Sequence, residues 1–111
     1  MNYTEEAIIV QKTPDGHWDQ TIDWGCPSRQ LGDDLIDVST WAVSGADSAL
    51  TLSDETISAD KKETTVWLTG GTLGVFYQVT NTITTEDGRI FTGTFVVSVV
   101  PYVYLVQPRT I

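Results

Sequence analysis

The chain has 111 residues and a formal net charge of −9, with fifteen acidic residues against six basic ones. This length predicts one domain. The few scattered basic residues offer no patch for nucleic acid phosphates or an anionic membrane. There is no apolar run long enough for a membrane-spanning helix, and the first residues lack the pattern of a secretory signal.

Alternation of apolar and polar residues predicts β-strands throughout, beginning with a strand at residues 7–11. A turn follows at residues 13–16, where Pro14 presets φ and the next Asp-Gly pair reverses the chain. Residues 18–24 predict a second strand, because one face carries Trp18, Gln20, Ile22 and Trp24.

Glycine, proline and paired aspartates make residues 25–34 a loop. Residues 36–43 predict the next strand, with a bulge near Ser39 and Thr40 because the apolar phase changes before Trp41. Residues 49–52 and 56–59 predict two short strands, and residues 60–63 a solvated turn.

Residues 64–89 are the most informative stretch, since they read as a strand, a glycine corner, a long strand and a hairpin turn. Tyr77 follows the corner glycines, as does the tyrosine of immunoglobulin-like sandwiches whose hydroxyl is tied to the upstream backbone. We therefore predict that Tyr77 pins a crossover between two sheets.

The final hairpin can be predicted to its register, because the apolar residues of both strands occupy odd positions. A three-residue loop at 86–88, with Gly88 left-handed, keeps both apolar faces on one side. It predicts the pairs Ile83 with Phe91, Val79 with Phe95, and Tyr77 with Val97. Gly93 then lies opposite Asn81, where it leaves room for the asparagine side chain.

About seven short strands predict an all-β fold, a single immunoglobulin- or fibronectin-III-like antiparallel β-sandwich over residues 1–101. Pro101 interrupts the last strand, so residues 102–111 are predicted to form a C-terminal apolar arm. Its candidate partner-binding residues are Tyr102, Val103, Tyr104, Leu105 and Val106. The arm either adds to a neighbouring subunit or folds back beside residues 7–10.

The sequence does not predict an enzyme. His17 is the only histidine and Cys26 the only cysteine, and the intervening strand separates them by about 20 Å. Cys26 alone cannot form an internal disulfide. The chain lacks a zinc ligand set, and the loop acids Asp33, Asp34, Asp47 and Asp54 match no calcium motif. No cofactor or metal is expected.

The four tryptophans divide into two groups. Trp24, Trp41 and Trp67 each end or centre an alternating strand and are predicted to lie in the core. Trp18 opens a strand beside a turn, so an exposed aromatic platform for sugars is an alternative role for it.

Two blocks of the sequence are especially specific, Thr-Val-Trp-Leu-x-Gly-Gly at 65–71 and Tyr-x-Val-Thr at 77–80. Gly-Asp-Asp-x-Ile at 32–36 and Ser-Thr-Trp-x-Val at 39–43 precede them. In this order the blocks resemble a group of small tailed-phage virion proteins, the fibre–tail adaptor proteins. The similarity runs from about Trp18 to Phe95. The predicted first strand and the predicted apolar arm lie outside this region of similarity.

The resemblance implies a structural virion protein of a tailed bacteriophage, made in the host cytoplasm, that joins fibre or neck components to the tail. It implies an immunoglobulin-like module with no catalytic residues. The expected partners are other virion proteins and further copies in a ring, with no nucleic acid and no membrane. The alternative is a free-standing domain that recognises a host surface or carbohydrate.

Overall fold

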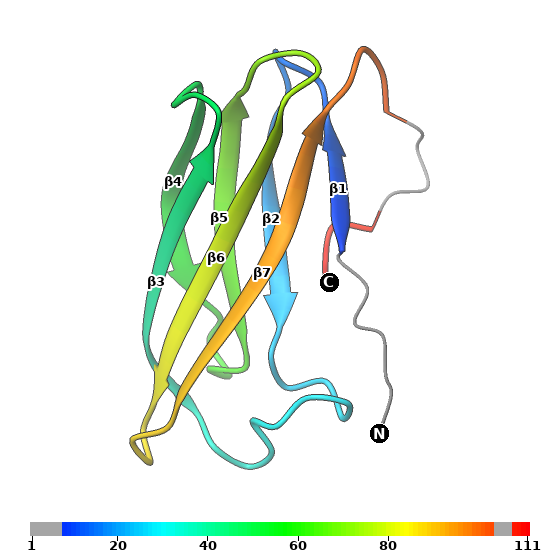
Figure 1. Ribbon diagram of the computed structural model, residues 1–111. Helices are drawn as coiled ribbons and strands as arrows, with labels where there is room; N and C mark the ends of the chain where they lie inside the picture. Colours follow the sequence, from blue (N-terminus) through cyan, green and yellow to red (C-terminus); the bar gives the residue numbers. More distant parts are fainter. Residues whose placement is uncertain (1–7, 104–107) are drawn as a thin grey trace, which may run out of the picture.

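The computed structural model describes residues 8–103 and 108–111, and shows no helix among them (Figure 1). None of the described residues belongs to a helix that could span a membrane. The seven strands are β1 (Ile9–Lys12), β2 (His17–Asp23), β3 (Ile36–Gly45), β4 (Leu50–Ile57), β5 (Glu63–Gly70), β6 (Phe76–Thr85) and β7 (Ile90–Val99).

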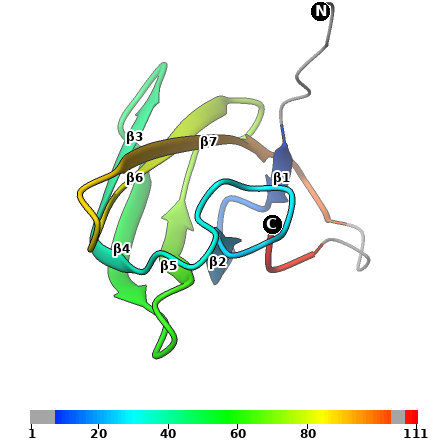
Figure 2. The same ribbon diagram turned by 90° about the horizontal axis from the view of Figure 1, so that it is seen from below.

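The strands form two packed sheets, with the orders β1-β7-β6-β3 and β2-β5-β4 (Figure 2). This confirms the predicted sandwich. All pairings are antiparallel except that of β1, which runs parallel to β7. In the constant-type immunoglobulin arrangement the first strand joins the sheet of the second. Here β1 lies beside the last strand instead.

The predicted register of the final hairpin is confirmed. Ile83 lies opposite Phe91, Val79 opposite Phe95, and Tyr77 opposite Val97. Gly88 has a φ of 88°, the left-handed conformation that the three-residue loop needs.

The Tyr77 corner is also confirmed. The backbone N–H of Thr72, in the glycine corner, donates a 2.9 Å hydrogen bond to the Tyr77 hydroxyl. Tyr77 is only 1 % exposed, so its ring closes one end of the core. Tyr77 thus ties the connection between β5 and β6 to the sandwich interior.

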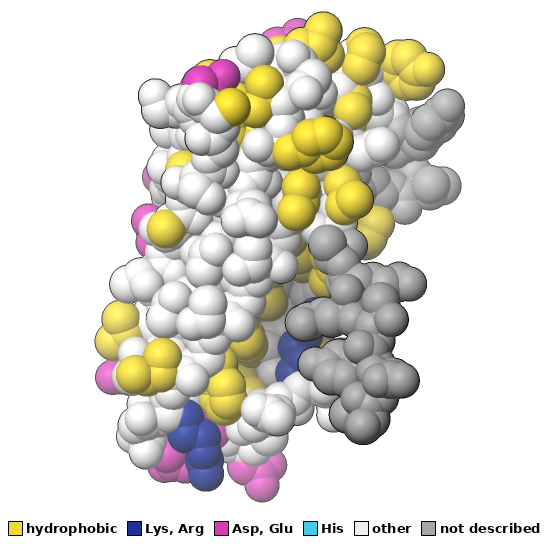
Figure 3. Space-filling model, viewed as in Figure 1, with side chains coloured by type: hydrophobic (Ala, Val, Ile, Leu, Met, Phe, Trp, Pro, Cys, Tyr) yellow, Lys and Arg dark blue, Asp and Glu magenta, His cyan; other side chains and the backbone are white. Residues whose placement is uncertain are grey.

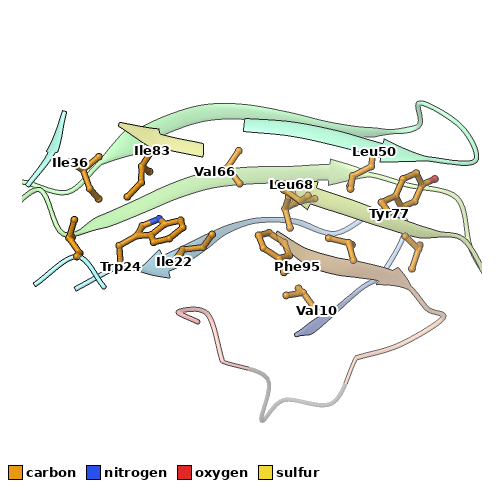
Figure 4. Close-up of a cluster of buried hydrophobic side chains, with 14 residues drawn as sticks. Val10, Ile22, Trp24, Ile36, Leu50, Val66, Leu68, Tyr77, Ile83 and Phe95 are labelled. Carbon is orange, nitrogen blue, oxygen red and sulfur yellow. The ribbon is translucent and has the colours of Figure 1, made fainter. Parts of the chain in front are cut away.

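The core lies between the sheets, where the alternate residues of each strand meet (Figure 4). Its buried apolar side chains are Val10, Ile22, Trp24, Leu31, Ile36, Leu50, Val66, Leu68, Tyr77, Val79, Ile83, Phe95, Val97 and Val99. The core also holds a polar network: the Trp24 indole N–H donates to Asn81 Oδ1 at 2.9 Å, and the Thr64 hydroxyl donates to the same oxygen at 2.6 Å.

Two predictions about the middle strands are wrong. The β3 bulge lies between Ile36 and Val38 rather than near Ser39 and Thr40, so Val38 faces outward and is 48 % exposed. The two short strands are one strand, β4, whose register shifts between Ser53 and Thr56. Asp54 takes a φ of 51° there, so the chain bulges without leaving the sheet.

The tryptophan predictions are partly wrong. Trp24 is buried, and Trp41 is partly buried against the core. Trp67 points to the outside of the sheet instead, because the inward side of β5 is taken by its neighbours Val66 and Leu68. Trp18 also packs against the core, and the Lys12 ammonium lies 5.7 Å from its ring centroid, which argues against an exposed sugar platform.

The role of Gly93 differs from the prediction as well. Gly93 does lie opposite Asn81. A Cβ at this position would come within 2.9 Å of the Trp24 ring, so the glycine makes room for Trp24 rather than for Asn81. The indole fills the space above Gly93 and reaches Asn81 from there.

Candidate interaction surfaces

The predicted arm begins where β7 leaves the sheet. The Val100 N–H still donates to the Lys12 carbonyl oxygen at 2.8 Å, and Pro101 then ends this pairing. Tyr102 is 66 % exposed and Val103 is partly buried. The other predicted partner-binding residues, Tyr104, Leu105 and Val106, lie outside the described residues.

The last residues return to the sandwich along β2, which the sequence did not indicate. The Thr21 N–H donates to the Arg109 carbonyl oxygen at 3.0 Å, and the Ile111 N–H donates to the Thr21 carbonyl oxygen at 2.8 Å. Thr110 forms a parallel bridge to Thr21, and the Arg109 guanidinium lies 2.9 Å from the Asp19 carboxylate. Residues 109–111 therefore cover the outer edge of β2 from Thr21 to Asp23. Only one of them is apolar, so the sequence carries little signal for this pairing.

The outer face of the β1-β7-β6-β3 sheet has no charged side chain at its paired positions, although the chain as a whole is strongly acidic (Figure 3). Asp37, at the β3 bulge, stands outside the pairing. Hydroxyl pairs cross the two central strands, as between Thr80 and Thr94 at 3.0 Å. The outward residues in the pairing are Ile9, Gln11, Val38, Thr40, Ala42, Ser44, Phe76, Gln78, Thr80, Thr82, Thr84, Ile90, Thr92, Thr94, Val96 and Ser98. The sequence does not predict this uncharged face, because the face combines residues from four strands whose order is known only from the structure.

The outer face of the β2-β5-β4 sheet is different in character. Asp19, Asp23 and Glu63 project from it. The His17 ring stacks on the Trp67 ring there, with centroids 4.8 Å apart. Acidic side chains therefore occupy paired positions on the outer face of the β2-β5-β4 sheet but not on the outer face of the β1-β7-β6-β3 sheet.

A third surface is the open side of the sandwich between β3 and β4, which are edge strands of their sheets. A groove of about 660 Å³ runs between them and is lined by Trp41, Val43, Leu50 and Leu52, among others. The Trp41 indole N–H is buried and finds no acceptor among the described residues. β3 and β4, which line this groove, lie on the opposite side of the sandwich from β1 and the end of β7 in both ribbon views (Figures 1 and 2).

Asp34 organises the loop end of the sandwich. Burial raises the pKa of its carboxyl, but hydrogen bonds from the Thr85 hydroxyl, the Leu35 N–H and Arg89 outweigh this and lower the pKa to about 2. The Arg89 guanidinium lies 2.9 Å from Asp34 Oδ2. Lys62, expected in a solvated turn, instead donates to the carbonyl oxygens of Gly32 at 2.6 Å and Asp34 at 2.7 Å.

His17, Cys26 and the loop acids do not come together in one site among the described residues. His17 begins β2 and Cys26 follows its far end, so the two are not brought together. The described residues hold no group of three or more His, Cys, Asp or Glu side chains that could bind a metal. Of the loop acids, Asp34 is held by Arg89, and Asp47 accepts a hydrogen bond from the Tyr77 hydroxyl.

Comparison with known families gives the biological context. The family described as podophage GP4 fiber-tail adaptor protein gp77 matches residues 12–98, from the end of β1 almost to the end of β7. The chain belongs to this family. The resemblance noted from the sequence is thereby confirmed, and no curated protein sequence matches the chain significantly.

The adaptor is thus a structural component of the phage tail that joins fibres to the tail, and it is not an enzyme. As such it binds tail and fibre proteins. The matched region is the sandwich itself. Residues 99–111, with the arm, lie outside it.

Proposed function

We propose that the adaptor works as one subunit of a homo-oligomeric ring around the tail, and that residues 102–106 bind a neighbouring subunit. The observation that carries this proposal is the departure of the chain at Pro101, directly after the last pairing with Lys12. The next five residues form an uninterrupted apolar segment, Tyr-Val-Tyr-Leu-Val, of which Tyr102 is two-thirds exposed.

A run of five apolar residues is adhesive wherever it meets water, unless a partner covers it. The matched family region ends at residue 98, so this segment lies outside the shared sandwich. A ring also places several copies of a weak fibre or tail contact side by side, which strengthens attachment through multivalency.

The test replaces Tyr102, Val103, Tyr104, Leu105 and Val106 with Ser and Gly and leaves residues 108–111 in place. Simple truncation after Pro101 is less informative, because it also removes the residues that cover the edge of β2. Sedimentation velocity at rising concentration should show oligomers for the native chain and monomers for the variant, with similar melting temperatures.

Oligomers that persist in the variant would overturn the proposal. A native chain that stays monomeric at every concentration and binds glycans would overturn it in favour of a free-standing recognition domain.

A further inference from the structure

We infer that the groove between β3 and β4 is the receptor for residues 102–106 of the next copy of this chain. The inference rests on the proposed function, and it names the surface on which the arm acts. A backbone segment that leaves water needs partners for its N–H and C=O groups. The central strands β6 and β7 are paired on both sides, so only edge strands can supply them.

The fold leaves few long edges for such a segment. Residues 109–111 occupy the edge of β2 from Thr21 to Asp23, which leaves only its first few residues open, and β1 has only four residues. β3 has ten residues and β4 has eight, and these two edges face each other across the groove. A five-residue extended segment spans about 17 Å, roughly half the length of a ten-residue strand. The five-residue segment is therefore short enough to pair along β3.

The chemistry of the groove suits an uncharged apolar strand. Trp41, Val43 and Leu52 offer apolar contacts for alternate side chains, and Val43 is 37 % exposed at the rim. The arm brings no charge toward the nearby acids Asp47 and Glu55, so it meets no like-charge repulsion.

The geometry also makes the contact directional. β7 ends beside β1, whereas β3 and β4, which line the groove, lie on the far side of the sandwich (Figures 1 and 2). An arm that enters the groove of the next copy repeats head to tail. Such a heterologous contact closes into a ring or extends as a filament, whereas contact between two identical faces would stop at a dimer.

The first experiment compares two substitutions on the same strand of the full chain. Val43→Asp places a charge in the groove, and Val38→Asp places the same charge on the outer face of β3. Val43→Asp should weaken self-association about tenfold or more, whereas Val38→Asp should change it by no more than about twofold. Near-ultraviolet circular dichroism checks that both variants keep the native fold.

The second experiment traps the contact in a Cys26→Ser background. Chains carrying Val43→Cys are mixed under mild oxidation with chains that carry a cysteine at one of the positions 102–106. Mixed disulfide dimers should form at one or two alternate arm positions and should be absent with Val38→Cys.

Assembly that depends on the arm but is insensitive to Val43→Asp, with no mixed disulfides, would overturn this inference and leave the proposed function standing. The arm would then bind elsewhere, as along β1. Assembly insensitive to both the arm and the groove would overturn the two together.

Discussion

The Tyr77 hydroxyl donates a 2.6 Å hydrogen bond to Oδ1 of Asp47, a residue thirty positions earlier in the connection between β3 and β4. The same hydroxyl accepts from the Thr72 N–H, so it joins two connections at one end of the sandwich. Hydrogen bonds from Tyr77, the Ala49 N–H and Thr72 lower the pKa of Asp47. Gly45 allows this approach, because a Cβ there would come within 2.6 Å of the tyrosine ring.

Tyr77→Phe should therefore cost about 1–2 kcal/mol of unfolding free energy, since it removes a hydrogen bond to a carboxylate and leaves the Thr72 N–H without its acceptor. Chemical denaturation measures this as a lower midpoint with an unchanged slope. Thr80→Val, which removes a hydroxyl on the outer face of the sheet, is the control. Equal midpoints for native and Tyr77→Phe chains would show that the corner does not contribute to stability.

Gly93→Ala should destabilise the fold by about 1–3 kcal/mol, because the new methyl group overlaps the buried Trp24 ring. The displaced indole should also lose its hydrogen bond to Asn81, visible as a change in tryptophan fluorescence. Thr94→Ala, on the outer face at the next residue, should leave both the midpoint and the fluorescence nearly unchanged. A neutral Gly93→Ala would mean that the Trp24 ring has room to move away from the new methyl group.

Trp41→Ala and Trp67→Ala compare the loss of an inward-facing tryptophan with the loss of an outward-facing one. Trp41 packs against the core, with its ring 6.3 Å from Phe95, and its loss should cost about 2–4 kcal/mol. Trp67 lies on the outer face against His17, so its loss should cost about 1 kcal/mol or less. Denaturation midpoints that reverse this order would contradict the inward placement of Trp41.

Acid should destabilise the protein as Asp34 gains a proton. Its folded pKa of about 2 lies below the ordinary 3.8, so the unfolded chain binds the proton first. The stabilisation from this carboxylate is fully present above about pH 5 and is lost as the pH falls through 3.8 towards 2. Asp47, whose pKa is also lowered, contributes in the same direction.

The Asp34→Asn variant measures the share of Asp34 in this acid sensitivity. It should be less stable than the native chain at neutral pH, and the difference should shrink as both are acidified. Melting temperatures followed from pH 7 downward give the comparison. A constant difference across that range would mean that the buried carboxylate keeps its ordinary pKa.

Chelator and reductant together should leave the melting temperature unchanged. The described residues hold no metal-binding group, and Cys26 is a free thiol. A fall of several degrees would reveal an ion bridging the loop acids or a disulfide between two copies.

The local signals in the sequence determined the strands of the sandwich other than β4, the Tyr77 corner and the register of the last hairpin. These features depend on alternation and on a few turn residues close together in the chain, such as Gly88. The family could also be inferred from the sequence, because its most specific blocks lie in this same region, between residues 65 and 80.

Only the tertiary structure decided how distant segments meet. The outward orientation of Trp67 depends on which side of β5 faces the opposite sheet, and an aromatic residue in an alternating strand suits either side. Residues 109–111 pair with β2 although nearly the whole chain separates them in sequence. No apolar pattern in these residues predicts the pairing. The uncharged positions of the sheet face and the β3–β4 groove likewise exist only once the strands are assembled, because each combines residues from several strands.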